Sequence, residues 1–344
     1  MILELSLTLA AALVGAYVAV KIRLPGGMII GSTVTTAMMA LWLGAEPLPF
    51  PVLVFLFVKV GVLLGLLVNR RSVQVLRPMF FPALFVSILM IVMGWVAIVL
   101  LRWWNAAPEG DILATAPGAL TVLGPAAANL GLDAPTVAFF HLVRIILTLL
   151  SIPLLLKFLP KETLTTPSPI GSIASPAAPP TSVALRWILV VTGAIAGAAI
   201  AEYLGMGGGV IFGGTIGTAI VMLMLPNPVR APNWLAPSVQ IGTGWMIGSL
   251  VTWESVAMIP RFVFPALFST IVLIGFGILS AFAMRAVGVR MRGDILATSP
   301  GAPEVFAVVA AEHDADAIQV AAFQTLRILL VVASLPILLQ LMPS

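Results

Sequence analysis

The chain has 344 residues, of which 60% are hydrophobic and only 9% are charged, and its mean hydropathy is +1.15. Soluble globular domains carry about a quarter charged residues, so this composition excludes an ordinary soluble protein and indicates a polytopic membrane protein. The absence of cysteine excludes disulfides, thiolate catalysis and cysteine-held iron–sulfur clusters.

Ten apolar runs are predicted as helices, and several are long enough to cross a bilayer, which takes about 20 residues. The first run lacks the positive segment of a cleaved signal peptide and is expected to be a retained span. Residues 160–182, rich in Pro, Ser, Thr and Ala, are expected to form a flexible cytoplasmic linker. The predicted helices are 3–20, 27–44, 50–68, 79–101, 136–158, 185–203, 208–225, 234–251, 262–284 and 318–341.

One ten-residue stretch occurs twice. Residues 110–119 read GDILATAPGA, and residues 293–302 read GDILATSPGA, with nine identities at an offset of 183 (293 minus 110). Each copy contains a Pro-Gly pair, which a straight helix tolerates poorly. Backbone groups left unpaired in lipid cost several kcal/mol each unless protein or water surrounds them. We therefore expect each copy to be a re-entrant or broken segment at membrane depth.

The similarity between the two parts of the chain extends beyond this stretch. FPALF at 81–85 recurs at 264–268, Arg144 corresponds to Arg327, and the glycine-rich segment 26–31 resembles 208–213. The sequence therefore predicts an internal duplication. Its parts are a first transmembrane repeat at 1–159, the linker at 160–182, and a second transmembrane repeat at 183–344.

Basic residues predict how the two repeats are oriented. With five crossings per repeat and the N-terminus outside, twelve Lys and Arg residues fall inside and two outside; six crossings per repeat give six inside and eight outside. The positive-inside rule favours five crossings. An odd number inverts the second repeat relative to the first, which is typical of secondary transporters. The expected fold is all-α, with two inverted repeats of five transmembrane helices.

The paired breaks are the predicted substrate site. A helix that restarts after a break presents free N–H groups and a positive dipole end to an anion, and the nearby carbonyl and hydroxyl oxygens suit Na⁺. The alternative is a structural kink that only allows helices to pack. The substrate-binding candidates in the breaks are Thr115, Pro117, Gly118, Thr298, Ser299, Pro300 and Gly301.

Arg144 and Arg327 are further substrate-binding candidates, each near the centre of the last span of its repeat. An arginine there costs about 2.5–3.5 kcal/mol on insertion scales and must have a partner. His141 and Gln324 precede them by three residues, on the same helix face. Each arginine either holds a substrate carboxylate or bonds to carbonyls exposed by the break or to the aspartates of the repeated stretch.

Four ionisable residues are candidates for ion coupling. Lys59 lies within the third span and corresponds to Gln240, which leaves open a proton or substrate role, although a lysine can also extend to the interface. Glu304 follows the second break and either binds a proton or Na⁺ or is an ordinary acid of a first helical turn. The other two are Asp111 and Asp294, near the start of each copy.

No metal, cofactor or enzymatic reaction is predicted. The cluster at 312–316 contains His313 and three acidic residues, but its spacing suits a polar loop on the inner face. No GxxxxGK[ST] loop is present, so ATP-driven transport by this chain alone is not expected.

The repeated Ala-Thr-[Ala/Ser]-Pro-Gly stretch, the acidic residues after it and the arginine of the next span (Arg144 or Arg327) resemble the AbrB-type family of bacterial membrane proteins. The resemblance covers nearly the whole chain and implies an internally duplicated AbrB domain. The first copy departs from the usual Pro-Gly-Gly at Ala119 and has Thr121 where an acid is common. Family labels include a regulator of gene expression and an ammonia monooxygenase. Two remote histidines do not supply the ligands of a copper or iron oxygenase, and no soluble DNA-reading module is present.

Together, these features predict a secondary active transporter of a small solute, with an organic anion favoured. The predicted mechanism is alternating access with H⁺ or Na⁺ symport. The predicted site lies between the two broken segments. The alternative is a membrane-embedded ligand sensor or regulator of gene expression without transport. Expected partners are the lipid bilayer, the substrate and the coupling ion, with no nucleic acid; a homodimer is left open. The expected location is the bacterial inner membrane, with ten spans and both termini outside.

Overall fold

The computed structural model describes residues 2–24, 27–44, 47–68, 80–108, 111–117, 120–156, 183–204, 209–226, 229–289, 293–300, 306 and 317–340. Within these ranges all extended regular structure is α-helical and no strand occurs. The helices are α1 (Ile2–Lys21), α2 (Gly27–Leu43), α3 (Phe50–Leu66), α5 (Phe80–Trp103), α6 (Asp111–Thr115), α7 (Leu120–Asn129), α8 (Ala134–Leu156), α9 (Val183–Tyr203), α10 (Gly209–Met224), α11 (Leu235–Ser249), α12 (Trp253–Ala286), α13 (Asp294–Thr298) and α15 (Ala317–Gln340).

The predicted apolar runs coincide with described helices, with one clear exception. The run predicted at 262–284 is the later part of α12, which begins at Trp253. The hydroxyl of Thr252 accepts a hydrogen bond from the backbone N–H of Ser255 at 3.2 Å, and this cap starts the helix nine residues before the predicted run. In the described part of the chain, four helices are long and apolar enough to cross a membrane, namely α1, α5, α9 and α12.

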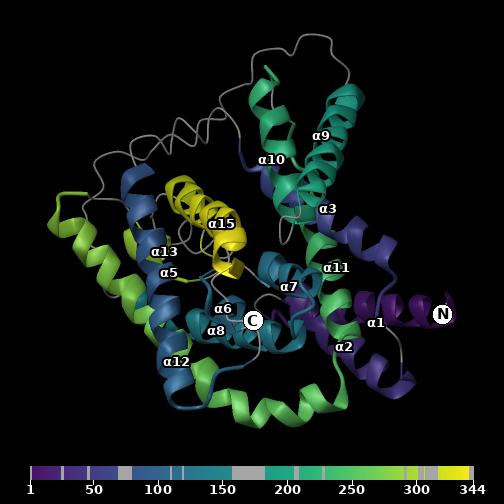
Figure 1. Ribbon diagram of the computed structural model, residues 1–344, viewed down its shortest axis with the longest axis horizontal. Coiled ribbons are helices and arrows are strands. Elements are labelled where there is room, and N and C mark those ends of the chain that lie inside the picture. The colour runs from purple at the N-terminus through teal and green to yellow at the C-terminus, as the bar shows by residue number, and fades with distance from the viewer. Residues whose placement is uncertain are drawn as a thin grey trace.

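The helices form two groups, and each group contains helices from both repeats (Figure 1). The panel group contains α1, α2 and α3 with α9, α10 and α11; α2 packs on α11, and α3 packs on α10. The break group contains α5, α6 and α8 with α12, α13 and α15; α8 packs on α12, and α5 packs on α15. Helix α7 contacts both groups. The two repeats are therefore interleaved in space.

Helices α5 and α12 contain the equivalent FPALF segments, and they pack side by side in opposite directions. The ring of Trp104, just after α5, lies 6.0 Å from that of Phe264 and 5.0 Å from that of Phe268, in the first half of α12. At the other end, Met284 of α12 shares a hydrophobic cluster with Ala83 of α5.

Glycines bring helices into close contact at equivalent positions of both repeats. A β-carbon built on Gly31 of α2 would overlap the carbonyl oxygen of Gly15 of α1. Gly213 of α10 and Gly197 of α9 make the same contact 182 positions later (213 minus 31). Gly31 and Gly213 therefore permit close helix packing, because any side chain there would separate the helices.

Glycine contacts also show which residues of α3 and α11 are equivalent in the two repeats. Gly61 of α3 packs on α10, and Gly244 of α11 packs on α2, so the two positions are equivalent at an offset of 183 (244 minus 61). The same offset puts Gly242 at the position of Lys59. The sequence-based pairing of Lys59 with Gln240 is therefore wrong, since it is two residues out of register.

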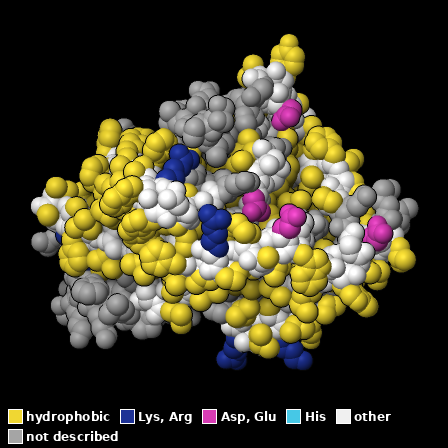
Figure 2. All heavy atoms as spheres, turned by 60° about the horizontal axis from the view of Figure 1, so that its bottom comes forward, with side chains coloured by type: hydrophobic (Ala, Val, Ile, Leu, Met, Phe, Trp, Pro, Cys, Tyr) yellow, Lys and Arg dark blue, Asp and Glu magenta, His cyan; other side chains and the backbone are white. Residues whose placement is uncertain are grey.

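Hydrophobic side chains cover much of the outer surface, and the charged side chains seen on the face in Figure 2 are few. On α1, for example, Val14 is 60% exposed and Tyr17 is 66% exposed. Apolar surface on this scale is unusual for a soluble monomer and marks contact with lipid or partners. The composition, the long apolar helices and this surface together identify a membrane-like protein.

Trp245 joins α11 to α1 through a buried hydrogen bond from its indole Nε1 to Thr8 Oγ1, at 3.0 Å. Trp245→Phe removes the donor and leaves unfilled space, so we expect the free energy of unfolding to fall by about 1–3 kcal/mol. Thermal unfolding in detergent measures this. Trp253→Phe is the control, because Trp253 is 68% exposed. Equal melting temperatures for the two variants would contradict the prediction.

Candidate functional site

Both copies of the repeated stretch form a short helix that ends at the expected interruption. Helices α6 and α13 are followed by bends at 116–117 and 299–300. Ser299 has φ −65° and ψ 142°, an extended conformation, because the ring of Pro300 disfavours a helical residue before it. Gly293, before α13, has φ 87°, which favours glycine. The predicted interruption is therefore confirmed in both copies.

Arg144 and Arg327 bond to carbonyl oxygens at the ends of these short helices. Arg144 donates from Nη1 to the carbonyl of Ala116 at 2.6 Å and from Nη2 to that of Ala114 at 2.9 Å. Arg327 donates from Nη1 to the carbonyl of Ser299 at 2.8 Å. The last carbonyls of a helix lack hydrogen-bond partners within the helix and form the negative end of its dipole. Each guanidinium group therefore donates to these carbonyls and also places a positive charge beside them. Of the partners predicted for the two arginines from the sequence, the structure therefore shows the carbonyls of the break, and it shows them for both arginines.

The residue three positions before each arginine makes a second, equivalent contact. His141 Nε2 lies 3.0 Å from the carbonyl oxygen of Leu113, and Gln324 Nε2 donates to the carbonyl of Leu296 at 2.7 Å. Both side chains are buried. Sequence analysis noted their spacing but did not include them among the site residues.

The threonines of the breaks attach the short helices to the neighbouring long ones. Thr115 Oγ1 donates to the carbonyl of Gly94 on α5 at 3.4 Å, and Thr298 Oγ1 donates to that of Gly277 on α12 at 2.8 Å. β-Carbons on Gly94 and Gly277 would lie 3.2 and 2.9 Å from the carbonyl oxygens of these threonines. Sequence analysis missed both glycines, although their offset of 183 (277 minus 94) was available as a signal.

The two arginines place positive charge deep in the break group. Arg144 is 1% exposed and Arg327 is fully buried. No described carboxylate lies within ion-pair distance of Arg144, whose described partners are the two carbonyls. Like charges add to the cost of burial, and a bound anion would lower that cost. The centre is therefore suited to an anion.

Asp294, a predicted ion-coupling residue, is bonded to Arg285 at the end of α12. The guanidinium Nε and Nη2 lie 2.6 and 2.7 Å from the two carboxylate oxygens, and one of these oxygens also accepts from the N–H of Ile295 at 2.8 Å. The carboxylate is 1% exposed. In this conformation Asp294 tethers the start of α13 to α12.

Asp294→Asn is expected to lower the free energy of unfolding by about 1–3 kcal/mol, because an amide has one acceptor oxygen and no charge, so the contact between two oxygens and two guanidinium nitrogens is lost. We expect any ion dependence of function to remain. Thermal unfolding in detergent and an ion titration measure the two effects, with the exposed acid Glu254→Gln as the control. Loss of the ion dependence with unchanged stability would instead support the coupling role.

Lys59 lies in the panel group, away from the arginine contacts. Its Nζ donates to the carbonyl of Ser238 on α11 at 3.3 Å and lies 5.4 Å from the centre of the Phe55 ring. These contacts join α3 to α11. The structure therefore does not bring Lys59 together with the breaks.

The remaining predicted site residues are only partly described. Pro117 and Pro300 are buried at the two bends. Gly118, Gly301 and Glu304 lie outside the described residues, as do the side chain of Asp111, the predicted linker and the cluster at 312–316. Among the described side chains, no group of three or more His, Asp or Glu could hold a metal ion.

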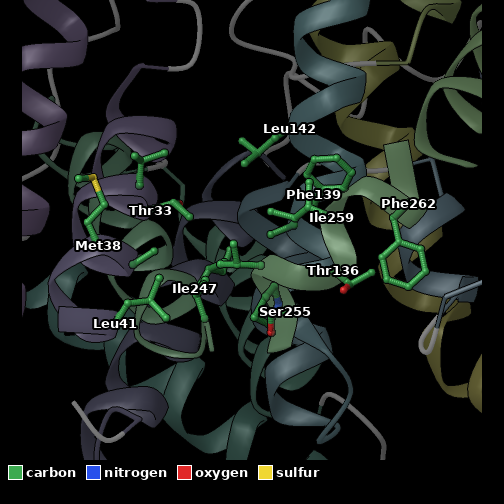
Figure 3. Close-up of a pocket in the computed structure, with 16 residues that line it drawn as sticks. Thr33, Met38, Leu41, Thr136, Phe139, Leu142, Ile247, Ser255, Ile259 and Phe262 are labelled. Atoms are coloured by element: carbon green, nitrogen blue, oxygen red, sulfur yellow. The ribbon is translucent and has the colours of Figure 1, made fainter. Parts of the chain in front are cut away.

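A cavity of about 310 Å³ lies between the two helix groups (Figure 3). Helices α2 and α11 line it from the panel group, and α8 and α12 line it from the break group. The lining is apolar except for hydroxyls such as those of Thr33, Thr136 and Ser255, and it includes none of the predicted site residues. The cavity therefore lies at the boundary between the groups and apart from the predicted site residues.

Comparison with known proteins agrees with the repeated geometry. The model of a family described as "Transition state regulatory protein AbrB" matches residues 1–160 and again residues 162–343. The uncharacterized protein YhjN of Bacillus subtilis (strain 168) is 26% identical over 286 residues, which cover 80% of this chain and 74% of that protein. No solved structure matches.

Proposed function

This chain belongs to the AbrB family, and from that premise we propose that it is a secondary active transporter of a small organic anion, coupled to H⁺ or Na⁺. The proposal assigns it no catalytic reaction. The observation that carries it is the buried cationic centre: Arg144 and Arg327 sit at two equivalent interruptions of the chain. Transporters commonly bind their substrates where paired, discontinuous helices meet.

The orientation of α5 and α12 supports the proposal that the repeats are inverted. These helices contain the equivalent FPALF segments and run antiparallel, as equivalent helices of opposite membrane orientation must. In the proposed topology, each repeat has five spans in the inner membrane, and both termini lie outside. The breaks then approach the site from opposite faces of the bilayer, as in transporters built from inverted repeats.

In the proposed site, a carboxylate binds the arginines beside Thr115, Pro117 and Gly118 in one repeat and the segment 298–301 in the other. A guanidinium group can exchange a carbonyl partner for a carboxylate, which makes a stronger, charge-assisted contact. A bound carboxylate would then replace one or both of the carbonyl contacts of Arg144.

The division into two groups supports a mechanism for alternating access. Both breaks belong to the break group, and the panel group contains neither. Movement of the break group against the panel group would carry the site between the two sides of the membrane. The cavity between α2, α8, α11 and α12 lies on the boundary where such movement would occur.

Uptake by the purified protein in proteoliposomes tests the proposal. We expect at least one of a panel of radiolabelled organic anions to accumulate when an inward H⁺ or Na⁺ gradient is imposed. An absence of uptake across the panel under either gradient would contradict transport.

The second candidate is a ligand sensor or regulator in the membrane, which the word "regulatory" in the family description favours. A sensor would bind a ligand without moving it. Thermal unfolding detects binding in either case, because a ligand that prefers the native state raises the melting temperature. A ligand that raises the melting temperature but is not taken up in proteoliposomes would identify a sensor.

A further inference from the structure

We propose that His141 binds the coupling proton of this site and takes it up together with an anion at Arg144. The inference rests on the proposed transport function and identifies its coupling ion as H⁺. His141 lies on α8, one turn before Arg144, and is 1% exposed. Its ring is held to the end of α6 by the contact between Nε2 and the carbonyl of Leu113.

This contact determines which ring nitrogen can take up a proton. A carbonyl oxygen only accepts hydrogen bonds, so Nε2 must carry a hydrogen, and Nδ1 is the basic nitrogen of the neutral ring. Protonation at Nδ1 leaves the bond to Leu113 in place. His141 can therefore change its charge while staying attached to the break.

Arg144 is the charged residue of α8, three positions after His141 and on the same face of the helix. Helices α6, α7, α11, α12 and α13 pack against α8, and α7 and α11 contain no charged residue. Asp294 of α13 is bonded to Arg285 of α12, and the side chain of Asp111 in α6 lies outside the described residues. The other charged side chains on these helices are Glu254 and Arg261. Both are exposed and lie on the early part of α12.

The neighbouring positive charge links the proton to the anion. A proton on His141 creates a second cation beside Arg144, which is unfavourable while Arg144 is not neutralised. An anion bound to Arg144 reduces that repulsion and so favours the protonated ring. By reciprocity, protonated His141 strengthens anion binding by the same factor. Joint binding of a proton and an anion is the requirement for symport.

The second repeat contains a natural comparison. Gln324 occupies the position of His141 and makes the same contact, to the carbonyl of Leu296 at 2.7 Å, with a side chain that does not titrate. Attachment to the break therefore does not require an imidazole. His141→Gln is expected to retain the attachment and to remove only the proton site.

Nitrogen NMR of the full-length protein in nanodiscs tests the coupling directly. The chain has two histidines, so His313→Asn leaves His141 as its only imidazole signal. We expect sodium lactate or sodium succinate, and not sodium chloride, to move the titration midpoint of His141 to higher pH by about one unit, which corresponds to roughly tenfold tighter anion binding. Arg144→Gln is expected to abolish the shift. A midpoint unchanged by both carboxylates would overturn the proposal.

Proteoliposomes loaded with a pH-sensitive dye provide the second test. A lactate or succinate gradient is expected to drive proton uptake by the wild-type protein. In His141→Gln, proton uptake should be lost, and carboxylate uptake should no longer respond to a proton gradient. Proton uptake that persists in this variant would overturn the role of His141. An absence of carboxylate flux in the wild type would contradict transport itself, and the NMR titration would still decide whether the proton and the anion bind together.

Discussion

Arg144→Gln is expected to reduce anion uptake roughly 100-fold, because losing a charge-assisted contact to a carboxylate costs about 2–3 kcal/mol. Its effect on stability should be smaller. The variant leaves the carbonyls of Ala114 and Ala116 without their donor, but it also removes a buried charge, and these effects oppose each other. We therefore expect a large loss of uptake with a modest change in melting temperature.

Two further variants separate the charge of Arg144 from its shape. Arg144→Lys keeps the charge, but a single ammonium group cannot reach both carbonyls as the planar guanidinium does, so intermediate uptake is expected. Arg230→Gln makes the same chemical change at an exposed arginine and should leave uptake unchanged. Uptake by Arg144→Gln at the level of Arg230→Gln would show that Arg144 does not contact the anion.

The helices and the interruptions could be predicted from sequence because both depend on local chemistry. Long apolar runs have few alternatives to a helix in lipid, and a proline such as Pro300 disfavours the helical conformation of the residue before it. The early start of α12 was missed because it depends on the Thr252 cap, which hydropathy does not detect. The grouping of helices from different repeats was also missed, since contacts such as that between Gly61 and α10 join residues far apart in the sequence.

The candidate site was predicted less completely than the fold. Sequence analysis identified Arg144 and Arg327 as residues that need partners, but burial alone could not choose between an acid, a carbonyl and a substrate. It also left open the partner of Asp294, which is Arg285, nine residues earlier across a turn. This contact joins the end of α12 to the start of α13, and no periodic pattern in the sequence encodes it.

Gly277→Leu is expected to abolish uptake, because Gly277 supports the second break from the side of α12. A β-carbon there would lie 2.9 Å from the carbonyl oxygen of Thr298 and 3.3 Å from the Cα of Ser299. Both atoms belong to the backbone, so the break itself must shift, and overpacking of this kind costs about 1–3 kcal/mol. The shift would also disturb the bond from Thr298 Oγ1 to the carbonyl of Gly277 and the one from Arg327 to Ser299.

Gly275→Leu is the matched control for Gly277→Leu, two residues earlier on the same helix. A β-carbon on Gly275 would have no neighbour within 4 Å, so the added side chain should leave both uptake and melting temperature near the wild-type values. Because both variants add the same apolar side chain to α12, helix propensity and expression affect them alike. A difference in uptake between them would therefore arise from contact with the break. Equal uptake by the two variants would mean that the site tolerates displacement of the Thr298 backbone, and the break would then not be where the substrate binds.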